Sequence, residues 1–157
     1  MQSIEFDRID LKILDFLQEH GRASNLELAD AISLSASQCH RRHHRLEELG
    51  VITGYETRLS PGSLGLGVVA FVHVAMEKGH IAKLHKFTGA IQALPEVLEC
   101  FSVTGDFDYV IKVVARDLKA LSQFLMDTLM ALPAVSNVRS SVCLDQIKNT
   151  GSLPLPR

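Results

Sequence analysis

Helical spacing of apolar residues predicts two short helices near the start of the chain. The first begins at Asp7, a residue type that favours the N-cap, and ends by Gly21. The second begins after Ser24, where Ser24 and Glu27 have the spacing of a capping box. The apolar side of the first helix consists of Ile9, Ile13, Phe16 and Leu17, and that of the second of Leu26, Leu28, Ala29 and Ile32.

A third helix is predicted from Ser35 to Leu49, and Gly50 ends it. Ser35 and Gln38 suggest another capping box, and Cys39, Leu46 and Leu49 have the spacing of an inward face. Only Ser33 and Leu34 separate this helix from the one before it. Two capped helices joined by so short a turn predict a helix-turn-helix.

The segment 51–59 has strand-like residues and ends at a Ser-Pro-Gly sequence, so we expect a strand followed by a hinge. The apolar run 68–76 is rich in valine and is predicted as the first strand of a second domain. We therefore place the boundary between the two domains in the glycine-rich stretch around residue 65.

The remaining sequence alternates between helical and strand patterns. Helices are predicted near residues 80–94 and 117–132, and strands at 97–104, 109–115 and 138–147. In the second helix Asp117 is the expected N-cap, and Leu118, Leu121, Leu125 and Leu129 have inward spacing. A Leu-Pro-x-Val sequence occurs at both helix-to-strand junctions, at Leu94 and again at Leu132. The order β-α-β-β-α-β is the ferredoxin-like arrangement.

The predicted fold class is therefore α+β. We expect a three-helix winged helix-turn-helix domain at 1–52 and a hinge strand and linker at 53–67. A ferredoxin-like βαββαβ domain at 68–148 and a tail at 149–157 complete the predicted organisation.

Composition narrows the class of protein. Of the 157 residues, 46% are hydrophobic and 22% are charged, and no stretch is long and apolar enough for a membrane helix. The start of the chain lacks the pattern of a secretory signal, so we expect a cytoplasmic protein without a membrane partner. The three cysteines are far apart and have neither disulfide nor zinc spacing.

Charge is concentrated on one helix, although the net charge of the chain is −2. Arg41, Arg42 and Arg45 lie on the outer side of the third helix. An arginine-rich helix face is more often simply solvated, but the second helix of a helix-turn-helix enters the DNA major groove. We therefore predict contacts to double-stranded DNA from Ser24, Ser35, Ser37, Gln38, His40, Arg41, Arg42, His44 and Arg45.

Four stretches of the chain resemble the Lrp/AsnC family, the feast/famine transcriptional regulators. They are 7–14, 35–52, 103–109 and the closing segment through 152–155, and together they span nearly the whole chain. The resemblance implies a DNA-binding domain, a hinge strand and a C-terminal domain that forms dimers through its sheet. It further implies that these homodimers assemble into larger rings, commonly octamers.

The resemblance also implies a site for an amino-acid effector at the turn 105–108. By itself this turn, with one glycine and two aspartates, is better explained as a hairpin closure. An amino acid needs an acceptor for its ammonium group and donors for its carboxylate. The candidate residues are Thr104, Gly105, Asp106, Phe107, Asp108, Ser140 and Ser141, and leucine, methionine or another apolar amino acid is the expected effector.

Two residues depart from the family pattern, which usually has proline at position 36 and an aliphatic residue at position 43. Here they are Ala36 and His43. Because the spacing from Cys39 directs position 43 inward, either His43 has a partner there or the helix sits differently.

Metal binding and catalysis have weaker support from the sequence. His40 and His44 are four residues apart on one helix, but neither has the further ligands expected of a metal site. We find no nucleophile with a base and no phosphate-loop spacing, so we expect neither a catalytic residue nor a cofactor. Two alternatives to an effector-responsive regulator remain at this point. One is an architectural DNA-binding oligomer that needs no effector, and the other is an enzyme or regulatory subunit that uses the ferredoxin-like domain.

Overall fold

The computed structural model describes residues 5–77 and 81–156 and contains two compact units. The first is formed by Met1–Arg58 together with Lys148–Arg157, and the second by Leu59–Ile147. The tail after residue 148 therefore packs with the N-terminal helices. Those parts of the predicted domains that fall on residues 1–4, 78–80 and 157 lie outside the described residues.

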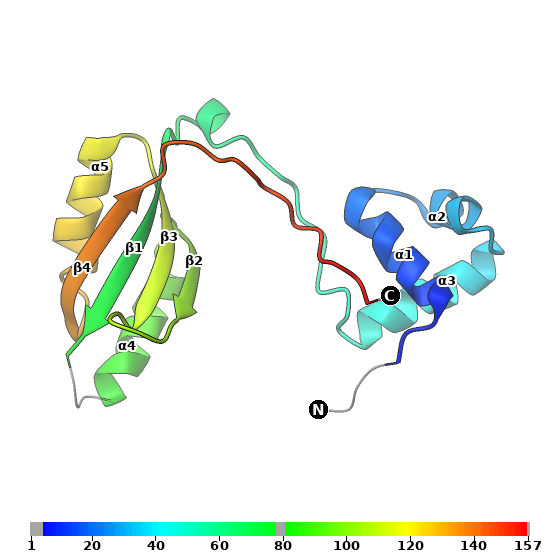
Figure 1. Cartoon of the computed structure of the whole chain (residues 1–157), viewed down its shortest axis with the longest axis horizontal. Helices are drawn as coiled ribbons and strands as arrows, with labels where there is room; N and C mark the ends of the chain where they lie inside the picture. Colours follow the sequence, from blue (N-terminus) through cyan, green and yellow to red (C-terminus); the bar gives the residue numbers. More distant parts are fainter. Residues whose placement is uncertain (1–4, 78–80, 157) are drawn as a thin grey trace. The chain divides into compact units, whose positions relative to one another are not determined.

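Three helices make up most of the first unit (Figure 1). They are α1 (Arg8–Glu19), α2 (Asn25–Ile32) and α3 (Ala36–Glu48). Asp7 is the N-cap of α1, as predicted, and it forms a capping box with Asp10. The predicted capping box of Ser24 and Glu27 is also present. Each helix thus begins where a side-chain oxygen can satisfy the free backbone N–H groups of its first turn.

The predicted capping box at the start of α3 is only half formed. The Ser35 hydroxyl accepts a hydrogen bond from the Gln38 backbone N–H over 3.4 Å. The side chain of Gln38, however, accepts from that same hydroxyl instead of reaching the Ser35 backbone N–H. Glutamine is uncharged, so the positive end of the helix dipole does not hold its side chain at the Ser35 backbone N–H. The side chain bonds to the Ser35 hydroxyl instead.

Three leucines that we predicted to face inward are exposed. Leu26 lies in the first turn of α2, Leu49 is the C-cap of α3, and Leu118 is the first residue of α5 (Leu118–Gln123). Periodicity identifies a side of a helix, but at a helix end the neighbouring turn that would cover the side chain is missing.

The core of the first unit joins the helices to the end of the chain. Its buried residues are Ile13, Leu14, Leu17, Leu28, Ala29, Cys39 and Leu46. Leu155 packs against this cluster. The side-chain amide of Gln18 bonds to both backbone groups of Leu153, donating to its carbonyl over 3.2 Å and accepting from its N–H. The tail is therefore fixed by polar and apolar contacts together.

The strand predicted at 51–59 is not formed in this chain. These residues belong to no helix or strand, so the predicted wing is also missing from residues 51–59. Strand-forming residues need a neighbouring strand for their backbone hydrogen bonds, and the single chain provides none here. Tyr55 instead contacts α3, where its hydroxyl bonds to His43 and Glu47. His43 is thus half-buried and paired, which was the first of the two alternatives.

The second unit is a four-stranded antiparallel sheet with helices on one face (Figure 1). The sheet order is β2-β3-β1-β4, as the ferredoxin-like arrangement requires. Its strands are β1 (Val68–Met76), β2 (Val97–Ser102), β3 (Tyr109–Ala115) and β4 (Val135–Val142), and its helices are α4 (Ile81–Gln92), α5, the π-helical turn η2 (Phe124–Leu129) and the short η1 (Gly62–Leu64).

Both Leu-Pro-x-Val sequences lie where we predicted a helix-to-strand junction, and each valine begins a strand. The last strand therefore starts at Val135, earlier than our prediction of 138, and it ends at Val142 instead of 147. Residues 143–147 belong to no strand, although the Cys143 backbone N–H donates to the carbonyl of Val69. Pairing with β1, rather than the run of residue types, fixes the end of β4.

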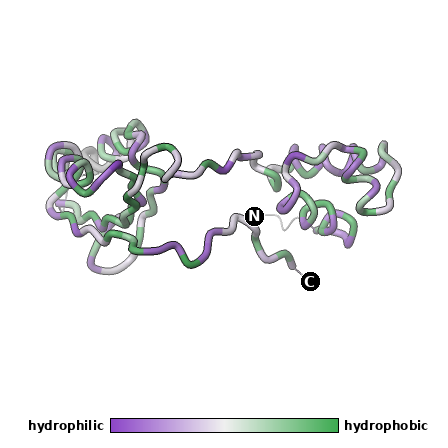
Figure 2. Tube along the Cα trace, turned by 90° about the horizontal axis from the view of Figure 1, so that it is seen from above, coloured by the Kyte–Doolittle hydropathy of each residue, from purple (hydrophilic) through white to green (hydrophobic). Residues whose placement is uncertain are grey.

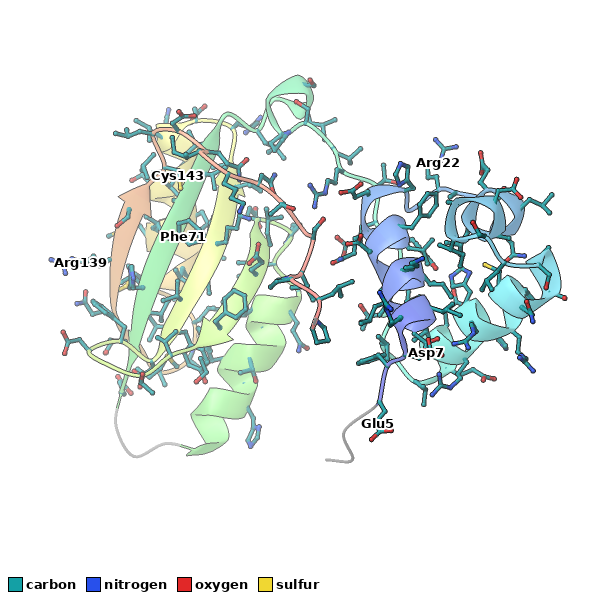
Figure 3. The ribbon with its side chains drawn as sticks, turned by 45° about the vertical axis from the view of Figure 1, so that its right-hand side comes forward. Glu5, Asp7, Arg22, Phe71, Arg139 and Cys143 are labelled. Carbon is teal, nitrogen blue, oxygen red and sulfur yellow. The ribbon has the colours of Figure 1, made fainter. Side chains whose placement is uncertain are left out.

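Side chains along β1 point alternately to the two faces of the sheet, one of which is covered by helices and the other bare. Ala70, Val72 and Val74 are fully buried beneath α4 and α5, whereas Phe71 points to the other side and is 40% exposed. The registered neighbours of Phe71 on that outer face are Lys112 and Ser141. Phe71 and Arg139 are labelled in Figure 3, and Phe101 on β2 adds a second exposed ring.

Hydrophobic and hydrophilic residues are interleaved along the chain, as Figure 2 shows. Among the described residues, no helix has the length and apolar character needed to cross a membrane.

Candidate nucleic-acid interface and ligand loop

The outer side of α3 presents most of the predicted DNA-contacting residues to solvent. Ser37, Gln38, His40, Arg41, His44 and Arg45 are all exposed. Cys39 and Leu46 are fully buried on the opposite side, so packing of the core fixes which side of α3 faces outward. Ser24 and Ser35 are exposed at the starts of α2 and α3, where both also serve as N-caps.

Arg42 differs from the other arginines because it binds α1. Its guanidinium contacts the carboxylates of Asp7 and Asp10 at 2.6 and 2.8 Å. Asp10 is only 2% exposed, and it also accepts a hydrogen bond from Arg45 over 3.2 Å. We predicted Arg42 as part of the free face, but the structure gives it the role of an ion-pair link between α1 and α3.

The same contacts shift the pKa values of Asp7 and Arg42. Hydrogen bonds from the backbone of Asp10 and from Arg42 lower the pKa of Asp7 below its ordinary value. Hydrogen bonds to Asp7 and Asp10 raise the pKa of Arg42. Hydrogen bonding to the charged form favours that form, so Asp7 and Arg42 are both ionised at neutral pH.

A shallow hollow lies over this part of α3. It is lined by Asp7, Arg41, Arg42 and Arg45. Arg41 forms no ion pair or hydrogen bond with the residues that the structure describes, and Arg45 remains half exposed beside Asp10. The hollow thus combines one uncommitted guanidinium with two that carboxylates already hold, a set of donors suited to phosphate oxygens or base edges.

His40 and His44 stack on the surface of α3 with nearly parallel rings whose centroids are 6.2 Å apart. His44 lies within 3.6 Å of Glu47 and 3.4 Å of Glu48, carboxylate partners that we did not anticipate. Within residues 5–77 and 81–156, no group of three or more side chains is arranged to hold a metal ion.

The predicted ligand loop connects β2 to β3, which form the expected hairpin. Gly105 has a φ of 121°, a backbone conformation that side-chain-bearing residues rarely adopt. Thr104 and Asp106 are exposed, whereas the Phe107 ring lies 5.3 Å from that of His73 on the outer face of β1. The loop therefore reaches the bare side of the sheet through Phe107.

Asp108 has a structural role in the same loop. Its carboxylate accepts a hydrogen bond from the Met76 backbone N–H over 2.7 Å. Its own N–H donates to the carbonyl of Val74. These bonds join the loop to the end of β1, next to the irregularity in its pairing with β4. Asp106 is therefore the less committed of the two carboxylates that we proposed as ammonium acceptors.

Ser140 and Ser141 are not brought together with the loop in this chain. Ser140 pairs with Val72 and Ser141 with Phe71, so successive serines point to opposite faces of the sheet. The loop bonds to β1 at Val74 and Met76, which are two and four residues, or about 7 and 13 Å, farther along that strand than Val72.

Comparison with known families finds one family model in the N-terminal part of the chain and a second in the C-terminal part. The AsnC-type helix-turn-helix domain matches residues 6–47, and the Lrp/AsnC ligand binding domain matches residues 69–153. The chain belongs to the Lrp/AsnC family of transcriptional regulators. The helix-turn-helix match contains all of α1 and α2 and nearly all of α3, and the ligand-domain match contains the candidate loop and the sheet from the second residue of β1 onward.

Individual Lrp/AsnC proteins are similar over almost their full length. The leucine-responsive regulatory proteins of Salmonella typhimurium and Escherichia coli K12 are each 38% identical to this chain over 149 residues, which are 95% of this chain and 91% of the relative. A Neisseria meningitidis transcriptional regulator, solved as a complex with L-Met, superposes with a TM-score of 0.92 at 41% identity, covering 96% of this chain and 97% of its own.

An AsnC family transcriptional regulator of Agrobacterium tumefaciens has a TM-score of 0.89 and 34% identity, covering 95% of this chain and 97% of its own. These relatives are transcriptional regulators, and the enzyme alternative is thereby removed. In this Lrp/AsnC chain, we did not predict Asp7 and Asp10 as neighbours of the arginines. The signal for them was their place at the start of α1, where we assigned a role only to Asp7, as the N-cap.

Proposed function

We propose that this Lrp/AsnC regulator binds double-stranded DNA of defined sequence through α3, and that a small amino acid changes its assembly or its DNA affinity. The observation that carries the DNA part is the exposed polar face of α3 with Arg41 at its centre. Serine, glutamine and arginine side chains on such a helix can bond to base edges, and Arg45 beside them can reach phosphate.

Replacing Arg41 with alanine tests the DNA-binding face. We expect DNA binding to weaken by about 1–3 kcal/mol if Arg41 contacts a base, or the salt dependence to fall by about one unit if it contacts a phosphate. Lys12→Ala removes an exposed cation from α1 and serves as the control. Fluorescence anisotropy with labelled duplexes at several salt concentrations measures both quantities. Equal affinity and equal salt dependence in the two variants would reject α3 as the helix that contacts DNA.

For the ligand, we propose the turn at 104–108 together with Ser140 or Ser141. Asp106 provides an exposed carboxylate for an ammonium group, and the backbone at Gly105 allows close approach. The neighbour solved with L-Met and the relatives named leucine-responsive support an apolar amino acid such as methionine or leucine. Because the serines lie away from this turn in a single chain, the complete site requires a contact between copies.

The outer face of the sheet provides the proposed contact. Phe71 and Phe101 are 40% and 56% exposed there, and the Nδ1 atom of His73 is buried without a hydrogen-bond partner among the described residues. Apolar rings gain from being covered, and an unsatisfied polar atom gains from a neighbour that supplies a hydrogen bond. We propose that two copies pack through this face as a homodimer, and that dimers assemble further, with an octamer as the expected ring.

An architectural DNA-binding oligomer without an effector is the second candidate, favoured by the structural role of Asp108 in the loop. Isothermal titration calorimetry of the twenty amino acids against the full chain separates the two. The proposal requires at least one amino acid that binds and also changes DNA affinity, because coupling between two sites is reciprocal. Absence of binding by all twenty would favour the architectural role.

A further inference from the structure

Five charged side chains meet where α1 crosses α3, three arginines and two aspartates. Arg42 contacts both Asp7 and Asp10, and Arg45 contacts Asp10. Only Arg41 has no carboxylate partner among the described residues. The positive charge that α3 offers to DNA is therefore much smaller than its number of arginines indicates.

The two aspartates differ in exposure. Asp10 is 2% exposed and lies beneath the arginines, whereas Asp7 is 51% exposed and lines the hollow together with Arg41 and Arg45. Figure 3 labels Asp7 at the beginning of α1. An anion that enters the hollow therefore meets the carboxylate of Asp7 as well as the guanidinium groups.

We propose that Asp7 is a specificity-determining residue: its carboxylate opposes the binding of DNA phosphates at the α3 arginines and so suppresses sequence-independent binding. The inference rests on the proposed DNA-binding function. Binding without sequence preference comes almost entirely from neutralisation of phosphates by cations, whereas base contacts add energy only at matching sequences. A fixed anion beside the arginines therefore weakens the first kind of binding more than the second.

The substitution Asp7→Asn removes the charge and preserves the helix start, because asparagine is as good an N-cap as aspartate. Its amide oxygen can still accept a hydrogen bond from Arg42. Asp7→Ser also leaves a good N-cap but has a different shape, so agreement between the two variants assigns an effect to the charge. Asp15→Asn is the matched control, because Asp15 is an exposed carboxylate on the same helix and does not line the hollow.

The experiment measures the binding of two duplexes over a range of salt concentrations. One duplex has random sequence, and the other is enriched from a random library by the wild-type protein. We expect Asp7→Asn and Asp7→Ser to bind the random duplex about tenfold more tightly, with a salt dependence steeper by about one unit. Affinity for the enriched duplex should rise less, so the ratio of the two affinities falls. Asp15→Asn should match the wild type.

Random-duplex affinity and salt dependence that are the same in Asp7→Asn, Asp7→Ser and Asp15→Asn would overturn the inference while leaving the proposed function intact. An equal gain for both duplexes would also overturn it, since Asp7 would then not affect specificity. A wild-type protein that binds neither duplex and yields no enriched sequence would instead overturn the proposed function, and this inference with it.

Discussion

Replacing Phe71 with lysine tests whether the bare face of the sheet joins two copies of the chain. Phe71 lies on the central strand β1 and points away from the helices. A phenylalanine side chain has about 200 Å² of surface, and 40% of Phe71 is exposed, so about 80 Å² remains available for burial. A partner copy that covers this ring removes that area from water.

The expected effect follows from this area. Burial of apolar surface contributes about 25 cal/mol per Å², so the lost area is worth about 2 kcal/mol per copy and about 4 kcal/mol per homodimer. The dissociation constant should therefore rise about a thousandfold.

Sedimentation velocity over a range of protein concentrations measures the dissociation constant. Met126→Lys is the control, because Met126 is 65% exposed on η2, among the elements that cover the other face of the sheet. It introduces the same residue without touching the proposed interface. A Phe71→Lys protein that self-associates as strongly as Met126→Lys would show that the bare face of the sheet does not join two copies, and would assign assembly to another surface.

Three further predictions concern the tail, the ion pair and the loop. Gln18→Ala, which removes both bonds to Leu153, should lower the stability of the first unit by about 1–2 kcal/mol in urea unfolding monitored by circular dichroism, and an unchanged midpoint would contradict the tail contact. The pKa of Asp7 is lowered on folding, so the stability difference between wild type and Asp7→Ala should be present at neutral pH and shrink below about pH 4, as thermal unfolding at each pH would measure. Asp106→Ala should abolish calorimetric binding of an identified amino acid and leave effector-free DNA affinity unchanged; retained binding would place the ligand elsewhere.

The helix starts were predictable from local chemistry. Asp7, Ser24 and Asp117 are N-caps at the expected positions, because capping depends on residues within three positions of the helix start. Both Leu-Pro-x-Val junctions were predictable for the same reason. The ends of strands were harder to predict from the sequence, because pairing with β1, and not composition, determines where β4 begins and ends.

Partners distant in the sequence could not be predicted from a single chain. Helical periodicity placed Arg42 on the outer side of α3, but it carries no information about which residue of another helix lies beside it. Likewise, nothing in the pattern around Asp108 distinguished a ligand contact from a bond to the backbone of β1. The sequence pattern therefore assigned the candidate residues to their helices, strands and turn, whereas the contacts of individual side chains required the fold.

The docked tail gives the two units an unusual connectivity. Because residues after 147 return to the helices, the whole ligand-binding unit is an insertion within the DNA-binding unit, with one covalent crossing near residue 58 and another near residue 147. Leu155 and Leu153 join the helical core only after the entire sheet has been synthesised. The DNA-binding unit therefore completes its packing last, although its helices are synthesised first. Any strain that the inserted unit exerts reaches the DNA-binding unit through two chain segments instead of one.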